Sequence, residues 1–114
     1  MTDNFKELTK NTSKYLQKFR TDMPELMKGF SGMASAATKD GALDKKQKEL
    51  VALGIAVSGR CSACIGFHTK TLLELGATKE EITETLGMAV YMGGGPSLMY
   101  AAEALQAMEE FQKA

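Results

Sequence analysis

The stretch from residue 44 to residue 75 reads DKKQKELVALGIAVSGRCSACIGFHTKTLLEL and has two apolar segments separated by Gly59-Arg60. In both segments the apolar residues recur at helical spacing, and neither shows the alternation of a half-buried strand. The Gly-Arg pair interrupts this periodicity, as a turn or a sharp kink does. We therefore predict two helices, at 44–58 and 61–75, that fold back on each other as a hairpin.

Residues at the ends of these segments support helix boundaries. Asp44 can accept amide hydrogens at a helix start, and Gln47, three residues on, can reach back to complete a capping box. Thr78 and Glu81 repeat this pattern and predict the start of a further helix. Gly76, between the two starts, suits the left-handed conformation that often ends a helix.

The rest of the chain follows the same periodicity and contains only two prolines. We predict further helices at about 3–20, 24–37, 78–92 and from 96 on, with the last two separated by Gly93-Gly94-Gly95. The first two helices should pack through these apolar side chains: Phe5, Leu8, Tyr15, Leu16 and Phe19, then Leu26, Met27, Phe30, Met33 and Ala37. The predicted fold is all-α, a bundle of five or six helices. At 114 residues, the chain should form a single domain, 1–114.

Composition excludes several classes of function. Lys and Arg number 14, as do Asp and Glu, so there is no basic surplus for nucleic-acid binding. The first residues lack the apolar segment of a secretory signal, and the longest apolar run, 50–57, is too short for a membrane span. We expect a cytoplasmic protein without a membrane or nucleic-acid partner. Gly93-Gly94-Gly95 lacks the Lys-Ser/Thr of a phosphate loop, and we expect no cofactor.

The two cysteines carry the main chemical signal. In the cytosol, a pair of cysteines is more often reactive or metal-binding than a structural disulfide. Cys61, Cys64 and His68 stand at i, i+3 and i+7, which places all three on one helix face. The two sulfurs can close a disulfide in the first turn, where the amide groups and the helix dipole favour thiolate.

Glu49 is the expected partner of His68. It precedes the Gly59 turn by about as many residues as His68 follows it, so the hairpin would bring the two side chains face to face. Glu49 also shares a helix side with small apolar residues, where a carboxylate can take part in proton exchange. The alternative is an exposed i,i+4 pair with Lys45, which would have no functional meaning.

These residues resemble the Glu-x11-Cys-x2-Cys-x3-His signature of AhpD-like (alkyl hydroperoxide reductase D-type) proteins, of the carboxymuconolactone decarboxylase superfamily. The similarity is strongest over 41–111 and includes three further segments: Gly41-Ala42-Leu43-Asp44, Leu75-Gly76-Ala77-Thr78 with Glu80-Glu81, and Gly93-Gly94-Gly95-Pro96. The resemblance implies an all-helical fold that assembles into homo-oligomers, hexamers or trimers. It also implies a redox-active cysteine pair that reduces hydroperoxides.

Carried onto this chain, the resemblance assigns four roles. Cys64 would attack the peroxide and become a sulfenic acid, Cys61 would close the disulfide, and His68 with Glu49 would relay protons. A thiol or dithiol reductant would then reopen the disulfide. This chain has Ala63 where characterised AhpD proteins have a second histidine. The decarboxylase branch lacks the cysteine pair, so lactone decarboxylation is not expected here.

Other functions remain open from the sequence. The cysteine pair could exchange disulfides with proteins, or sense redox state in a non-enzymatic oligomeric module. It could also bind a metal ion, although a tetrahedral site would need two ligands besides the cysteines, and only His68 and Glu49 are nearby. Finally, the cysteines could simply fill the core.

Overall fold

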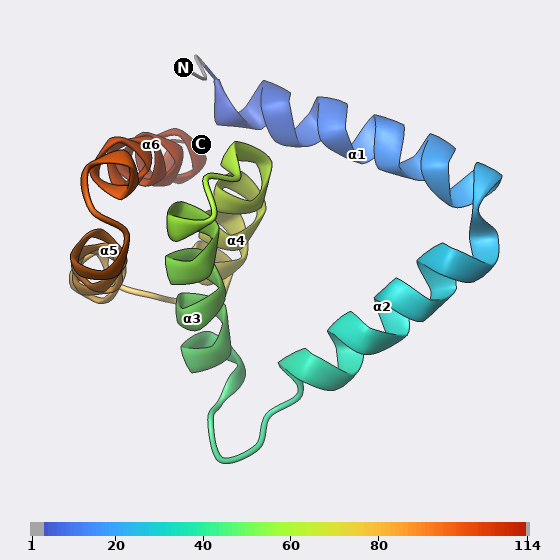
Figure 1. Ribbon diagram of the computed structural model, residues 1–114, viewed down its shortest axis with the longest axis horizontal. Coiled ribbons are helices and arrows are strands. Elements are labelled where there is room, and N and C mark those ends of the chain that lie inside the picture. Colours follow the sequence, from blue (N-terminus) through green and yellow to red (C-terminus); the bar gives the residue numbers. More distant parts are fainter. Residues whose placement is uncertain (1–3, 114) are drawn as a thin grey trace.

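The computed structural model describes residues 4–113 and confirms the all-α prediction for them: six helices and no strand (Figure 1). The predicted helix start at Asp3 lies outside the described residues. The helices are α1 (Phe5–Asp22), α2 (Pro24–Thr38), α3 (Lys45–Ser58), α4 (Ser62–Glu74), α5 (Lys79–Gly93) and α6 (Gly95–Gln112). The observed boundaries lie within a few residues of the predicted ones, the usual spread for frayed helix ends.

The bundle is formed by α3 to α6, which we define as residues 45–112. Helix α3 packs on α4 and α5, and α6 closes the bundle against α4 and α5. Its core is aliphatic and small: Leu53, Ala56, Val57, Ile65, Leu72, Ile82, Leu86, Ala89, Ala101, Ala104, Ala107 and Met108 are buried. Phe5 from α1 joins this core and is fully buried.

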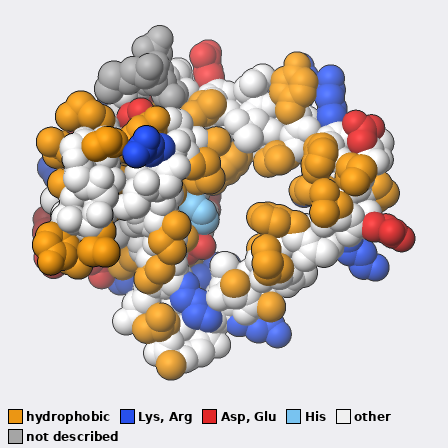
Figure 2. Space-filling model, in the orientation of Figure 1, with side chains coloured by type: hydrophobic (Ala, Val, Ile, Leu, Met, Phe, Trp, Pro, Cys, Tyr) orange, Lys and Arg blue, Asp and Glu red, His pale blue; other side chains and the backbone are white. Residues whose placement is uncertain are grey.

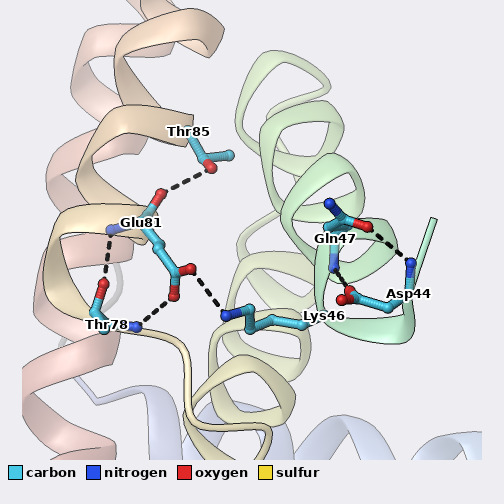
Figure 3. A network of polar contacts seen from close by, with 6 residues as sticks. All are labelled: Asp44, Lys46, Gln47, Thr78, Glu81 and Thr85. Atoms are coloured by element: carbon cyan, nitrogen blue, oxygen red, sulfur yellow. Dashed lines mark hydrogen bonds and ion pairs between the residues drawn. The ribbon is translucent and has the colours of Figure 1, made fainter.

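Both capping boxes form, and they are joined by an ion pair (Figure 3). Asp44 accepts from the amide of Gln47, and Thr78 accepts from the amide of Glu81, with the reciprocal bonds also present. Lys46 Nζ lies 2.9 Å from Glu81 Oε2. This ion pair joins the starts of α3 and α5. Lys46 lies three residues before Glu49 on α3.

The predicted turn between α3 and α4 is present and tight. Gly59 keeps a right-handed conformation, and Arg60 is the residue with positive φ, at 59°. Arg60 donates its amide to Val57, and Cys61 donates to Ala56. A non-glycine residue therefore occupies the left-handed position immediately before the first cysteine. Gly76 has φ of 81°, as predicted for the end of α4.

Residues 10–38, which we call the arm, contribute no buried residue to the bundle. They form the outer part of α1 and all of α2, which stand away from α3 and α4 (Figure 1). The prediction that the first two helices pack through their apolar faces is wrong for the arm within one chain, because α2 has no buried residue. The exposed apolar side chains are Tyr15, Leu16, Phe19, Met23, Leu26, Phe30 and Met33. Figure 2 shows apolar side chains along the arm beside an opening toward the bundle.

Helical periodicity could not settle this point, because it shows which face is apolar and not what covers that face. Only the start of α1 is docked: Phe5 and Thr9 are buried there. Within residues 4–113, no helix is both long enough and apolar enough to cross a membrane.

Candidate functional site

The two cysteines lie at the start of α4 and are joined by a disulfide. Cys61 is the N-cap residue, and its sulfur accepts a hydrogen bond from the amide of Cys64 at 3.2 Å. The two Cα atoms are 5.2 Å apart. Both cysteine residues are partly exposed. The spacing-based expectation that the sulfurs can bond within the first helical turn is met.

Glu49 and His68 face each other across the α3–α4 hairpin. Glu49 Oε1 and His68 Nδ1 are 2.7 Å apart. When Nδ1–H donates to the carboxylate, the neutral ring keeps its lone pair on Nε2, the nitrogen that can accept a proton. The alternative of an exposed Glu49–Lys45 pair does not fit, because Glu49 is only 5% exposed.

The histidine is more accessible than its partner. The His68 side chain is 34% exposed, against 7% for the Glu49 side chain. A carboxylate held in the interior, with an imidazole between it and solvent, is suited to orienting the ring and balancing its charge when the ring is protonated. The arrangement can therefore move a proton between solvent and the interior of the bundle.

The cysteine pair and His68 lie at the start of and along α4, and α1 packs against the other side of this helix. Gly66 lies opposite Phe5 and Thr9, and a Cβ built on it would lie 2.7 Å from Thr9 Cγ2. No larger residue fits at this position without displacing Thr9 or Phe5. Gly66 lies midway between Cys64 and His68, so this contact holds the segment that carries the site.

Sequence analysis missed one charged residue, which is bonded to the residue that follows Cys61. Glu103, on α6, is only 8% exposed, and the Ser62 hydroxyl donates to its Oε1 at 2.7 Å. Ser62 follows Cys61 directly in the chain. The available signal was a carboxylate among the small apolar residues Ala101, Ala104 and Ala107, on a helix otherwise assigned to packing.

Two further observations bear on ligand binding. An apolar groove of about 640 Å³ runs between α3 and α5, and its lining includes none of the four predicted site residues. Across residues 4–113, no three His, Cys, Asp or Glu side chains are grouped so that they could hold a metal ion.

Comparison with known proteins places these features in a family. The model of the carboxymuconolactone decarboxylase family matches residues 24–107. A protein from Cupriavidus necator is 45% identical over 82 residues, which are 72% of this chain and 73% of that protein. The alkyl hydroperoxide reductase AhpD of Mycobacteroides abscessus is 32% identical over 63 residues, 55% of this chain but only 36% of that protein.

Two solved structures match nearly the whole chain. The crystal structure of an apo carboxymuconolactone decarboxylase family protein from Legionella pneumophila has a TM-score of 0.95 and 66% identity, over 98% of this chain and 100% of that one. A Thermotoga maritima protein of the same family, for which a role in the antioxidative response has been suggested, has a TM-score of 0.83 and 30% identity. That match covers 92% of this chain and 90% of the other.

Proposed function

This chain belongs to the carboxymuconolactone decarboxylase family, and from that premise we propose that it is a thiol-dependent oxidoreductase that reduces hydroperoxides. The proposal assigns the chemistry to Cys61 and Cys64 and the proton relay to His68 and Glu49. The observation that carries it is the combination of a Cys61–Cys64 disulfide with a 2.7 Å carboxylate–imidazole contact one to two turns further along the same hairpin.

The proposed reaction has two steps. The Cys64 thiolate attacks the peroxide, so that an S–O bond forms, the O–O bond breaks, and the leaving alkoxide takes a proton to become an alcohol. The Cys61 thiol then attacks the sulfenic sulfur, so that the S–S bond forms and water leaves. In sum, two thiols and one hydroperoxide give one disulfide, one alcohol and one water. A dithiol reductant returns the two electrons and two protons.

Proton handling follows from the geometry of the pair. His68 Nε2 can accept the proton of a thiol and return it to a leaving oxygen. Glu49 Oε1, on the other side of the ring, fixes the tautomer by accepting from Nδ1. The two residues can act in sequence because one faces the interior and the other is partly exposed.

The test uses cumene hydroperoxide and the reduced chain, followed by free-thiol count and intact mass. We expect fast oxidation with the loss of two hydrogens within one chain, reversed by a dithiol. Cys64→Ser should abolish peroxide consumption, and Cys61→Ser should let a sulfenic acid accumulate. Full activity in either variant would contradict the assignment.

The relay is tested with Glu49→Gln, which keeps the shape of the side chain and removes its charge. We expect a loss of about 100-fold in the oxidation rate, the lower end of a general acid–base contribution. Glu109→Gln changes an exposed carboxylate on α6 and serves as the matched control. Equal rates for Glu49→Gln and the control would remove Glu49 from the relay.

Ala63 favours a second candidate function, thiol–disulfide exchange, because the imidazole that the resemblance would place between the cysteines is absent. Under this alternative, reduced protein reacts with a disulfide such as oxidised glutathione faster than with the hydroperoxide. Ala63→His then provides a direct comparison, since it should raise the rate of peroxide reduction and leave the rate of disulfide exchange nearly unchanged.

A non-enzymatic redox sensor would form the disulfide without turnover.

We also propose that the chain works as a homo-oligomer, a trimer or hexamer, as the resemblance implies. The accessible surface is 7404 Å², whereas a compact monomer of this mass exposes about 6,100 Å². The excess is of the order that a chain buries in a standard interface, about 800 Å² per partner. The exposed apolar side chains of the arm supply a surface for it.

Light scattering after size-exclusion chromatography tests this assembly. The unaltered chain should have a mass of three or six copies, and Phe30→Ser, on the exposed face of α2, should shift it toward a single chain. Lys28→Ser, on the same helix, is the control. A single chain at millimolar concentration would overturn the proposal.

A further inference from the structure

A buried carboxylate that accepts a hydrogen bond from the residue next to Cys61 is left unused by the proposed relay. Glu103 is 8% exposed, lies on α6, and accepts the Ser62 hydroxyl at 2.7 Å. Burying a carboxylate is unfavourable unless hydrogen bonds or opposite charges compensate. The hydrogen bond from Ser62 to Glu103 links the first turn of α4 to α6.

Ser62 connects Glu103 to the cysteines. It is the first residue of α4 and follows Cys61, whose sulfur caps the same turn by accepting from the amide of Cys64. A hydrogen bond that fixes Ser62 therefore fixes the turn on which both sulfurs sit. A charge-assisted bond to a carboxylate is also stronger than one between neutral groups.

The charges around this turn come from several elements. The amide groups at the start of α4 favour thiolate, and Arg60 precedes Cys61 on an exposed turn. From α3, Glu49 is paired with His68 further along α4. From α1, Lys6 and Lys10 lie near Lys70, toward the far end of α4. From α6, Glu103 is the carboxylate joined to the cysteine turn through Ser62.

We propose that Glu103 is a positioning residue for the redox pair: it anchors the first turn of α4 through Ser62, and its negative charge opposes ionisation of the reduced cysteines. This role rests on the proposed thiol chemistry of Cys61 and Cys64. The negative charge of Glu103 counteracts the helix dipole, so the thiolate form of the reduced cysteines is less stabilised. The disulfide is therefore favoured at a given ratio of reduced to oxidised thiol reductant.

The experiment measures the alkylation rate of the reduced chain by iodoacetamide as a function of pH, with no peroxide present. In Glu103→Gln, the side chain keeps an acceptor for Ser62 and loses its charge. We expect the midpoint of the profile to fall by about half a pH unit or more, a change typical of removing one nearby charge. A midpoint that is unchanged or raised would overturn the proposal.

Variants of Ser62 keep the test decisive if Glu103→Gln fails to fold. Ser62→Ala cuts the link, lets the carboxylate move away, and should lower the midpoint by a smaller amount, whereas Ser62→Thr keeps the hydroxyl and should leave it in place. An unchanged midpoint in Ser62→Ala, or an equal shift in the exposed control Glu109→Gln, contradicts the role. Because this readout needs no peroxide, failure of peroxide reduction would not be mistaken for failure of the Glu103 proposal.

Discussion

The bundle and the arm contain similar apolar helices but use them differently. In the bundle, the apolar faces of α3 to α6 meet one another and bury aliphatic side chains completely. In the arm, α2 buries no residue, and its large apolar side chains remain exposed. All residues of the candidate site belong to the bundle or to the turn within it. The chain therefore packs the helices that carry its site into a closed core and leaves a separate apolar surface that it does not cover itself.

The sharpest test of this contrast compares a bundle residue with an arm residue. Ile65→Ala removes a fully buried side chain from α4 and should lower the free energy of unfolding by about 3 kcal/mol, or the Tm by about 10 °C or more. Leu26→Ala, 54% exposed on α2, should change the unfolding free energy of a single chain by about 0.5 kcal/mol or less. Thermal unfolding followed by circular dichroism at high dilution measures both.

Equal losses in the two variants would contradict this contrast, because they would mean that the arm is packed within one chain. A Leu26→Ala loss that grows with protein concentration would support it. Such a dependence is the signature of a surface that is buried only on assembly.

A smaller effect is expected where the arm joins the bundle. In Gly66→Ala the new methyl would overlap Thr9, and overpacking of this kind costs about 1–3 kcal/mol. The displaced α1 should also expose the arm to limited proteolysis. Gly87→Ala, on α5, has no atom within 4 Å of the added Cβ and should be neutral or slightly stabilising. If both variants behave alike, the α1–α4 contact does not hold the arm.

The smallest effect concerns the ion pair that joins the starts of α3 and α5. The hydrogen bond and charge of Lys46 lower the pKa of Glu81, and Glu81 raises the pKa of Lys46. Because the Glu81 pKa is lower in the folded chain, its contribution is present above the usual carboxyl pKa and is lost as pH falls through the folded value. The Lys46 contribution is present below the usual lysine pKa and is lost as pH rises through the raised one.

Glu81→Gln should therefore flatten the acid side of the stability–pH curve slightly, as measured by denaturant unfolding at a series of pH values. The effect should be modest because both side chains are about one-third exposed. Glu80→Gln, its exposed neighbour, is the control. A flattening of the same size in the control would show that the ion pair has no specific role.

Much of the bundle could be predicted from the sequence because its signals are local. The capping residues Asp44 and Thr78 fix helix starts within one turn, and the break at Gly59-Arg60 predicts the hairpin. Once the hairpin is assumed, Glu49 and His68 must meet, so this contact followed from spacing alone. Local rules were sufficient wherever the partners lie within one helical hairpin.

The sequence could not supply contacts between segments far apart in the chain. Ser62 and Glu103 are 41 residues apart, and no periodicity indicates which residue of α6 faces the start of α4. The packing prediction for the arm failed for a related reason. An amphipathic pattern is the same whether its apolar face packs against its own chain or against another. Arg60 illustrates a third limit, because the Gly59-Arg60 pair predicted a turn but did not show that Arg60 would be the residue with positive φ.

The short separations within the hairpin also bear on the order of folding. The cysteines are three residues apart and Glu49 is 19 from His68, whereas Phe5 donates its amide to Glu110, 105 residues away. Closing a short loop costs less chain entropy than closing a long one, so the α3–α4 hairpin should form before the start of α1 docks. Pulse-labelling hydrogen exchange should then find α4 amides protected earlier than those of α1. A refolding chain would thus bring Cys61 to Cys64 and Glu49 to His68 before its two ends meet.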